Sequence, residues 1–125
     1  MKTSEAIEQQ HLFQWAGFAE GKYPELRYMF HVPNGGSRNK AEAAHLKAQG
    51  VKSGVPDICL PVPKGSKHGL WIEMKSGRNK TTERQDAYLE FLKEQHYHVA
   101  VCYGWEEARE VILEYLGGNR NEKDV

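Results

Sequence analysis

The sequence has no long apolar run, few cysteines and no net charge. Its 125 residues contain no stretch of about eighteen apolar residues, so no segment is expected to span a membrane. The first residues, MKTSEAIEQQ, are polar where a secretion signal needs an apolar core, which predicts a cytoplasmic protein. Cys59 and Cys102 lie in apolar runs without nearby ligand residues, so we expect buried, reduced thiols. These absences argue against a membrane protein and a disulfide-stabilised secreted domain.

The length and composition that remain are those of one folded domain. Hydrophobic residues make up 39% of the chain and charged residues 27%, which is ordinary for a protein with a packed core. We expect a single domain over residues 1–118. The polar segment 119–125 is expected to form a flexible tail.

Charge is distributed unevenly along the chain although the total is zero. Residues 21–84 hold 12 Lys and Arg against 5 Asp and Glu, whereas residues 85–125 hold 4 against 9. This asymmetry can present a positive face to phosphate groups. Two differently solvated faces would have the same composition, so charge alone leaves both interpretations open.

The spacing of apolar residues predicts the element order α-β-α-β-β-α-β-α. Helices are expected over 4–19, 39–49, 82–95 and 105–116, and strands over 26–32, 57–62, 69–75 and 97–103. Ser4 is a candidate N-cap, and Thr82 with Gln85 fits a capping box. The third helix has a candidate buried stripe of Ala87, Tyr88, Phe91 and Leu92. We therefore expect an α/β fold, with a mixed central sheet flanked by helices.

Two charged residues stand together in the predicted strand 69–75. Side chains alternate between the faces of a strand, so Glu73 and Lys75 share one face. The apolar residues Leu70, Ile72 and Met74 share the other face and are expected in the core. This strand therefore holds a carboxylate and an ammonium side by side.

A second carboxylate begins the neighbouring predicted strand. Asp57 follows Pro56 directly and precedes an apolar run. If runs 57–62 and 69–75 pair as a hairpin around the 63–68 loop, Asp57 lies near Glu73 and Lys75. The prediction is conditional on that pairing.

Two carboxylates and a lysine form a set suited to phosphodiester hydrolysis. Mg²⁺ and Mn²⁺ prefer oxygen ligands, and a bound ion can polarise a phosphodiester and activate water. A lysine can stabilise the developing negative charge or orient the water. A Glu-X-Lys pair is also common on exposed strands, where it contributes under about 1 kcal/mol. The joint occurrence of Gly54-Val55-Pro56-Asp57 and Glu73-Met74-Lys75 favours the catalytic interpretation.

These two motifs resemble those of the PD-(D/E)XK nuclease superfamily. Within it, the chain resembles a stand-alone VRR-NUC domain of the kind found in phages and fused to larger repair nucleases, from about Ser4 to Leu116. The resemblance implies a restriction-endonuclease-like αβββαβ core. It also implies an extra helix after the first strand and another at the C-terminal end.

The resemblance also implies roles for individual residues. It places metal ligands at Asp57, Glu73, the backbone carbonyl of Met74 and an acid of the first helix, Glu8. Lys75 would be the catalytic lysine. Glu5 is the alternative helix acid, one turn earlier on nearly the same face. Gln85 matches a catalytic glutamine of the family, although the capping box alone would explain it.

Nucleic-acid contacts are expected from a glycine loop and from basic residues near the site. Two glycines let the backbone approach phosphate closely, and an arginine can bind it with two hydrogen bonds. An ordinary turn and a solvated basic loop are the alternatives. The residues in question are Asn34, Gly35, Gly36, Arg38, Lys40, Arg78 and Lys80.

We therefore expect a Mg²⁺- or Mn²⁺-dependent deoxyribonuclease acting on branched DNA, such as four-way junctions or flaps. The resemblance further implies a homodimer and, for a phage protein, the host cytoplasm and a role in DNA repair. One alternative is a nuclease-fold module that binds nucleic acid without cleaving it. Another is an assembly domain that uses the acidic helix 105–116.

Overall fold

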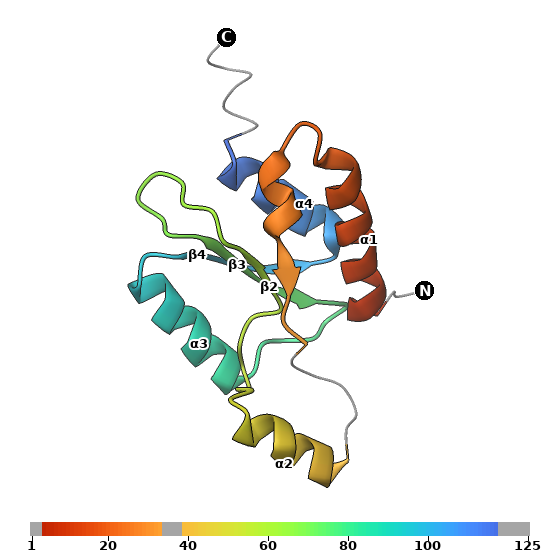
Figure 1. Cartoon of the computed structure of the whole chain (residues 1–125), viewed down its shortest axis with the longest axis vertical. Coiled ribbons are helices and arrows are strands. Elements are labelled where there is room, and N and C mark those ends of the chain that lie inside the picture. Colours follow the sequence, from red (N-terminus) through yellow and green to blue (C-terminus); the bar gives the residue numbers. More distant parts are fainter. Residues whose placement is uncertain (1–3, 34–38, 118–125) are drawn as a thin grey trace.

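The structure is a computed structural model that describes residues 4–33 and 39–117 (Figure 1). Within these ranges the chain forms an α/β fold in the predicted order, with one additional 3₁₀ helix. The elements are α1 (Glu5–Ala19), η1 (Pro24–Tyr28), β1 (Phe30–His31), α2 (Lys40–Ala48), β2 (Ile58–Leu60), β3 (Leu70–Lys75), α3 (Glu83–Glu94), β4 (His98–Tyr103) and α4 (Trp105–Tyr115). The predicted tail 119–125 lies outside the described residues.

The four strands form one mixed sheet in the order β1-β2-β3-β4. The pairs β1–β2 and β2–β3 are antiparallel, and β3–β4 is parallel. The predicted hairpin is confirmed, with Ile58 opposite Ile72. Asp57, one residue before Ile58, is thereby brought to the level of Glu73.

Helices cover both faces of the sheet. Helices α1 and α4 pack side by side over one face, and α3 lies on the opposite side (Figure 1). Leu70, Ile72 and Met74 of β3 point into the core beneath α1 and α4, as the alternation predicted. This leaves Glu73 and Lys75 on the opposite face of β3. No helix in the described ranges is long and apolar enough to cross a membrane.

Side-chain caps begin three of the helices. The Ser4 side chain accepts a hydrogen bond from the Ile7 amide, and Asn39 caps α2 in the same way. Thr82 and Gln85 form the predicted capping box at α3. The predicted buried stripe of α3 is confirmed at Leu92, while Leu89, which was not predicted, is buried in place of Ala87 and Phe91. Phe91 is 55% exposed, since α3 contacts the sheet mainly through β4 and buries only a narrow stripe.

The strand predicted over residues 26–32 is mostly a 3₁₀ helix. Pro24 stands at the start of η1, where its missing N–H costs no hydrogen bond. The tight turn buries Leu26 and Met29 in the core. Strand pairing is therefore limited to Phe30 and His31. The buried residues Leu26 and Met29 are three positions apart, which is the repeat of a 3₁₀ helix rather than of an extended strand.

Both cysteines are free and buried, as predicted. Burial raises the pKa of the Cys59 thiol to about 11. The pKa of Cys102 is raised to about 12, chiefly by burial and secondarily by the charge of Glu107. Both groups are therefore neutral thiols at physiological pH, with little tendency to react.

A glycine before Asp57 allows the chain to pass closely over α3. Gly54 has φ +89°, and a Cβ there would lie 2.7 Å from the carbonyl oxygen of Arg84. We expect Gly54→Ala to lower the free energy of unfolding by about 2 kcal/mol through backbone strain and this clash. Gly17→Ala in α1 is the matched control, because a Cβ there has no atom within 4 Å. Chemical denaturation should show the control equal to or more stable than wild type, by up to about 1 kcal/mol. Equal stability of the two variants would contradict the proposed close approach.

Candidate active site

Asp57 lies directly before β2 and is held by backbone amides of β3 and of the residue that follows β1. Its Oδ2 accepts a hydrogen bond of 2.8 Å from the Met74 amide of β3. Its own carbonyl oxygen accepts a 2.7 Å bond from the Val32 amide. The carboxylate is therefore fixed beside β3, with its orientation set by the hairpin.

Glu73 is a buried carboxylate next to Asp57. Only 3% of the residue is exposed. Its Oε2 accepts a hydrogen bond from Gln85 Nε2 at 3.2 Å and lies 3.8 Å from Lys75 Nζ. Its Oε1 is buried and has no hydrogen-bond partner among the described residues. An unpaired buried carboxylate oxygen is costly for a protein unless a ligand satisfies it.

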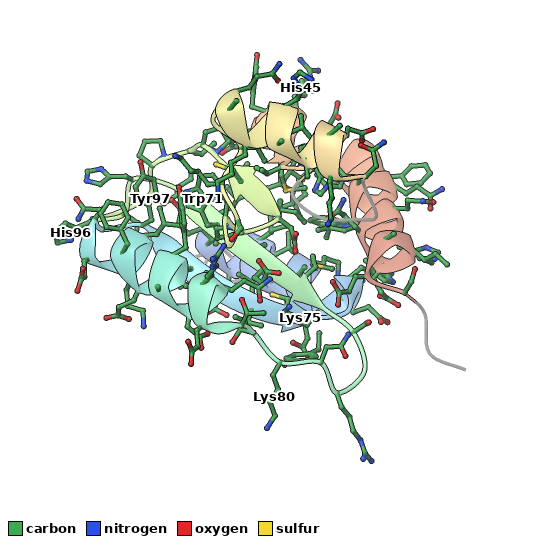
Figure 2. The ribbon with its side chains drawn as sticks, turned by 90° about the horizontal axis from the view of Figure 1, so that it is seen from below. His45, Trp71, Lys75, Lys80, His96 and Tyr97 are labelled. Atoms are coloured by element: carbon green, nitrogen blue, oxygen red, sulfur yellow. The ribbon has the colours of Figure 1, made fainter. Side chains whose placement is uncertain are left out.

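Lys75 is buried on the same face, with 7% of the residue exposed. It ends β3 opposite Tyr103 of β4. Figure 2 places it at the opposite end of β3 from Trp71, close to where the loop to α3 begins. Lysine is rarely buried unless it is paired. Its contact with Glu73 is therefore a buried ion pair rather than a solvated surface pair. The predicted association of Asp57, Glu73 and Lys75 is therefore present in the structure.

The two carboxyl groups perturb each other. Burial raises the pKa of Glu73 to about 8, and the charge of Asp57 is the next largest cause. The pKa of Asp57 is raised as well, mainly by burial. Hydrogen bonding with the Met74 amide and with the Glu73 side chain lowers it in part. Because like charges disfavour double ionisation, the pair holds a proton at neutral pH when no cation is near.

The chemistry of this pair fits a divalent cation. A cation near Asp57 and Glu73 would offset their mutual repulsion and supply a partner for the buried Glu73 Oε1. In the described ranges no three His, Cys, Asp or Glu side chains cluster as metal ligands. The protein would thus contribute two carboxylates, and water and phosphate would complete the shell, which is typical of Mg²⁺.

Of the two acids considered on the first helix, Glu5 is the one that faces this pair. It lines a cleft of about 270 Å³ together with Gln9, His31 and Asp57. Its charge also contributes to the raised pKa values of both Asp57 and Glu73. Its Oε2 accepts a hydrogen bond from Asn79 Nδ2 at 3.2 Å.

Glu8, the preferred acid in the sequence prediction, occupies a different position. Its Oε1 accepts a 2.8 Å hydrogen bond from the Trp105 amide at the start of α4. Gly104, the N-cap of α4, has no side chain to cap the helix, so Glu8 supplies the acceptor. One helical turn therefore separates a cleft-facing position, Glu5, from a capping position, Glu8, and the role of either residue as the helix acid of the site stays a prediction.

Gln85 forms the cap that the sequence predicted and also contacts Glu73, while its catalytic role stays a prediction. Its Oε1 accepts the Thr82 amide hydrogen bond of the capping box at 2.9 Å. Its Nε2 donates to Glu73 Oε2. One amide side chain therefore links the first turn of α3 to the buried carboxylate.

His31 is a site residue that sequence reasoning did not select. Its Nδ1 lies 3.0 Å from the Asp57 carbonyl oxygen, and its ring lines the same cleft as Glu5. The sequence indicated His31 only through its position, because it lies in the strand that pairs with the start of β2. A prediction would have required the register of that pairing.

The expected nucleic-acid contacts are only partly placed by the structure. Arg78 and Lys80 are exposed in the loop between β3 and α3, and Figure 2 shows Lys80 extending away from the body of the protein. Lys40 is exposed at the start of α2. The other four residues, Asn34, Gly35, Gly36 and Arg38, lie outside the described residues.

Comparisons with known proteins agree with the fold and the motifs. The VRR-NUC domain family matches residues 3–106, so this chain belongs to that family. A solved structure described as a VRR_NUC domain protein is 31% identical in sequence and has a TM-score of 0.76. The alignment covers 90% of this chain and 88% of that chain. A comparison with curated proteins finds no match. The chain therefore has a nuclease-type fold.

The double role of Gln85 can be separated by two substitutions. Gln85→Ala removes the acceptor of the Thr82 amide and the hydrogen bond to Glu73, whereas Thr82→Ala removes only the acceptor of the residue 85 amide. Both should lower stability by about 1 kcal/mol. For the nuclease activity that this family implies, we expect a loss of about tenfold in Gln85→Ala and a change of less than twofold in Thr82→Ala, since about 1.4 kcal/mol of positioning is lost only in the first. Equal cleavage by the two variants would assign Gln85 a capping role alone.

Proposed function

We propose that this protein is a divalent-metal-dependent DNA endonuclease whose site consists of Asp57, Glu73 and Lys75. The observation that supports it best is the buried Oε1 of Glu73, which is unpaired among the described residues and lies beside a second carboxylate and a buried lysine. Such a cluster is unfavourable for stability alone, which favours a functional reason for its presence.

Asp57 and Glu73 would hold Mg²⁺ or Mn²⁺, with the Met74 carbonyl as a further candidate ligand. A bound ion would supply Lewis-acid activation of the phosphodiester and of the attacking water. The Met74 amide orients Asp57, and Gln85 orients Glu73. Both carboxylates are thereby fixed before substrate arrives, which reduces the reorganisation needed during the reaction.

Lys75 would stabilise the negative charge that develops on the phosphate oxygens. Its ammonium is buried, so its field is less screened by water than that of an exposed lysine. Glu5 would act from the cleft wall, through water rather than as a direct ligand, because within the described ranges no third acid lies close enough to join the pair. His31 would steady the Asp57 backbone through the contact with its carbonyl oxygen.

Branched DNA is the substrate class that we propose, with a homodimer presenting two sites to opposite strands of a junction. This proposal follows from the resemblance to small stand-alone VRR-NUC domains. A monomer would instead favour flaps and nicks. The exposed Arg78 and Lys80 would contact the phosphate backbone beside the site in either case.

Cleavage assays with four labelled substrates test this function. Four-way junction, flap, single-stranded and duplex DNA are incubated with purified protein and Mg²⁺, Mn²⁺ or EDTA. We expect cleavage of branched substrates with either metal and none with EDTA. Cleavage that persists in EDTA would exclude the metal mechanism, and no cleavage of any substrate would favour a module that only binds nucleic acid.

A further inference from the structure

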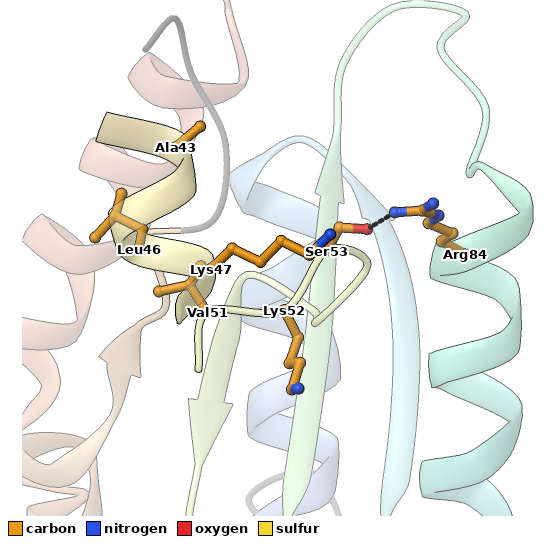
Figure 3. Close-up of a pocket in the computed structure, with 7 residues that line it drawn as sticks. All are labelled: Ala43, Leu46, Lys47, Val51, Lys52, Ser53 and Arg84. Carbon is orange, nitrogen blue, oxygen red and sulfur yellow. Dashed lines mark hydrogen bonds between the residues drawn. The ribbon is translucent and has the colours of Figure 1, made fainter. Parts of the chain in front are cut away.

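A second pocket lies between α2 and the start of α3, next to the proposed site. It has a volume of about 450 Å³ and is lined by Ala43, Leu46, Lys47, Val51, Lys52, Ser53 and Arg84 (Figure 3). Three of these residues are cationic, and none is acidic. We propose that this pocket binds one nucleotide of the DNA strand that occupies the active site, an inference that rests on DNA being the substrate.

One wall of the pocket is apolar because of how α2 ends. Gly50, with φ +103°, reverses the chain after the helix. The Val51 amide then donates a hydrogen bond to the Leu46 carbonyl at 3.0 Å. This turn folds Val51 back toward Leu46, and both remain accessible although they are aliphatic. An accessible apolar wall of this size suits the sugar or base of a nucleotide.

The opposite side of the pocket carries positive charge. Figure 3 shows Lys47 extending from α2 toward Ser53, while Arg84 reaches the same serine from α3. Arg84 Nη1 donates to Ser53 Oγ at 2.8 Å. Within residues 4–33 and 39–117, no ion pair involves Lys47, Lys52 or Arg84. These cations are therefore available to an anionic ligand, and phosphate is complementary to them.

The pocket is also joined to the proposed active site by short stretches of chain. Ser53 is followed by Gly54, which passes tightly over Arg84, and then by the turn that ends at Asp57. Arg84 is followed by Gln85, whose amide contacts Glu73. A continuous strand can thus contact both places, whereas a separate small ligand would not require this proximity. Proximity and charge together favour a segment of the substrate strand.

The remainder of α2 is consistent with a helix that contacts a ligand. None of its residues is buried, and it lies apart from the sheet in Figure 1. A helix without a buried face gains little stability from packing, so contact with a ligand would supply stabilisation that the fold does not.

Binding measurements on a non-cleaving protein test this site independently of catalysis. Fluorescence anisotropy with labelled single-stranded and branched DNA is measured in EDTA, in an Asp57→Asn background. We expect the double variant Lys47→Gln/Lys52→Gln to raise the Kd for DNA about tenfold. The slope of log K against log salt concentration should become about 1.5 less steep. The pair Lys67→Gln and Lys93→Gln removes the same charge elsewhere and should change Kd less than twofold. An equal effect of both pairs would overturn the proposed site.

The apolar wall is tested by Leu46→Ala. We expect Kd for ordinary single-stranded DNA to rise about threefold, in line with loss of a partly exposed apolar contact. A strand of the same length with abasic residues should bind both proteins equally. No effect of Leu46→Ala on ordinary DNA would overturn the assignment of a nucleotide pocket. So would displacement of labelled DNA from the pocket by micromolar free deoxynucleotide, since that would indicate a mononucleotide site.

The two proposals can fail separately. If wild-type protein cleaves DNA but the lysine pair binds normally, the pocket assignment is wrong and the nuclease proposal stands. If no DNA is cleaved but the lysine pair still weakens binding selectively, the pocket assignment stands and the nuclease proposal is wrong.

Discussion

Asp57→Asn is expected to lower DNA cleavage about a thousand-fold and to stabilise the metal-free protein at alkaline pH. The loss reflects Lewis-acid assistance worth several kcal/mol. The gain arises because asparagine can still accept the Met74 hydrogen bond while no longer repelling Glu73. Improved stability with lost activity is the pattern expected of a functional charge cluster.

The pH dependence gives the sign of this stability effect. The pKa of Glu73 is raised from 4.5, the ordinary value for a glutamate, to about 8 in the folded protein, so the native state holds more protons than the unfolded state between these values. Glu73 therefore contributes its full stabilisation to the wild type below about pH 4.5. This contribution is lost as the pH rises through about 8. In Asp57→Asn the pKa of Glu73 is lower, so this fall is smaller.

Thermal melts in EDTA at pH 5 and pH 8.5 measure the difference. We expect the melting temperature of Asp57→Asn to exceed that of wild type at pH 8.5 by about 4 °C, and the excess to shrink at pH 5. Glu94→Gln, on the exposed surface of α3, removes an acid without a buried partner and should follow the wild-type curve. An equal fall in the melting temperatures of the wild type and Asp57→Asn between pH 5 and pH 8.5 would contradict the proposed repulsion.

Lys75→Met is expected to lower cleavage by about a hundred- to a thousand-fold with little effect on DNA binding. Methionine suits the buried position of Lys75 but cannot stabilise charge on a phosphate. Because Lys75 lowers the pKa of Glu73, its removal should raise that pKa further. The residual cleavage should therefore require higher pH than in the wild type.

Rate–pH profiles and equilibrium binding in EDTA distinguish this role from a general phosphate contact. Lys93→Met, on the last turn of α3, is the matched control and should leave rate and profile unchanged. A large loss of DNA affinity in Lys75→Met, with an unshifted pH profile, would show that Lys75 binds substrate rather than assisting the reaction.

The fold could be predicted from sequence where local signals agreed with tertiary packing. Alternation in β3 predicted the two faces, and the capping signals of Ser4 and Thr82 located two helix starts. The segment before β1 was predicted as a strand because its apolar and aromatic residues are typical of strands, whereas a 3₁₀ helix begins there at Pro24. The stripe of α3 was partly misplaced, because only the position of the helix over β4 decides whether Leu89 or Phe91 is buried.

The site could be predicted where it depended on one strand and less well where it depended on several elements. Glu73 and Lys75 were paired by alternation within β3, and Asp57 by a simple hairpin. Which of Glu5 and Glu8 lies near the carboxylate pair depends on how far α1 extends along its axis over the sheet, because the two residues share nearly the same face and periodicity does not distinguish them. The basic pocket joins α2 to α3, and no local pattern predicts that approach.

Calorimetric titration of the protein with Mn²⁺ at pH 7 tests the central claim most directly. In two buffers of different ionisation enthalpy, we expect binding with release of about one proton, because the cation displaces the proton that the carboxylate pair holds at this pH. Affinity should rise about tenfold per pH unit below pH 8 and be lost in Asp57→Asn. Binding without proton release, or equal binding by Asp57→Asn, would contradict a metal site at this carboxylate pair.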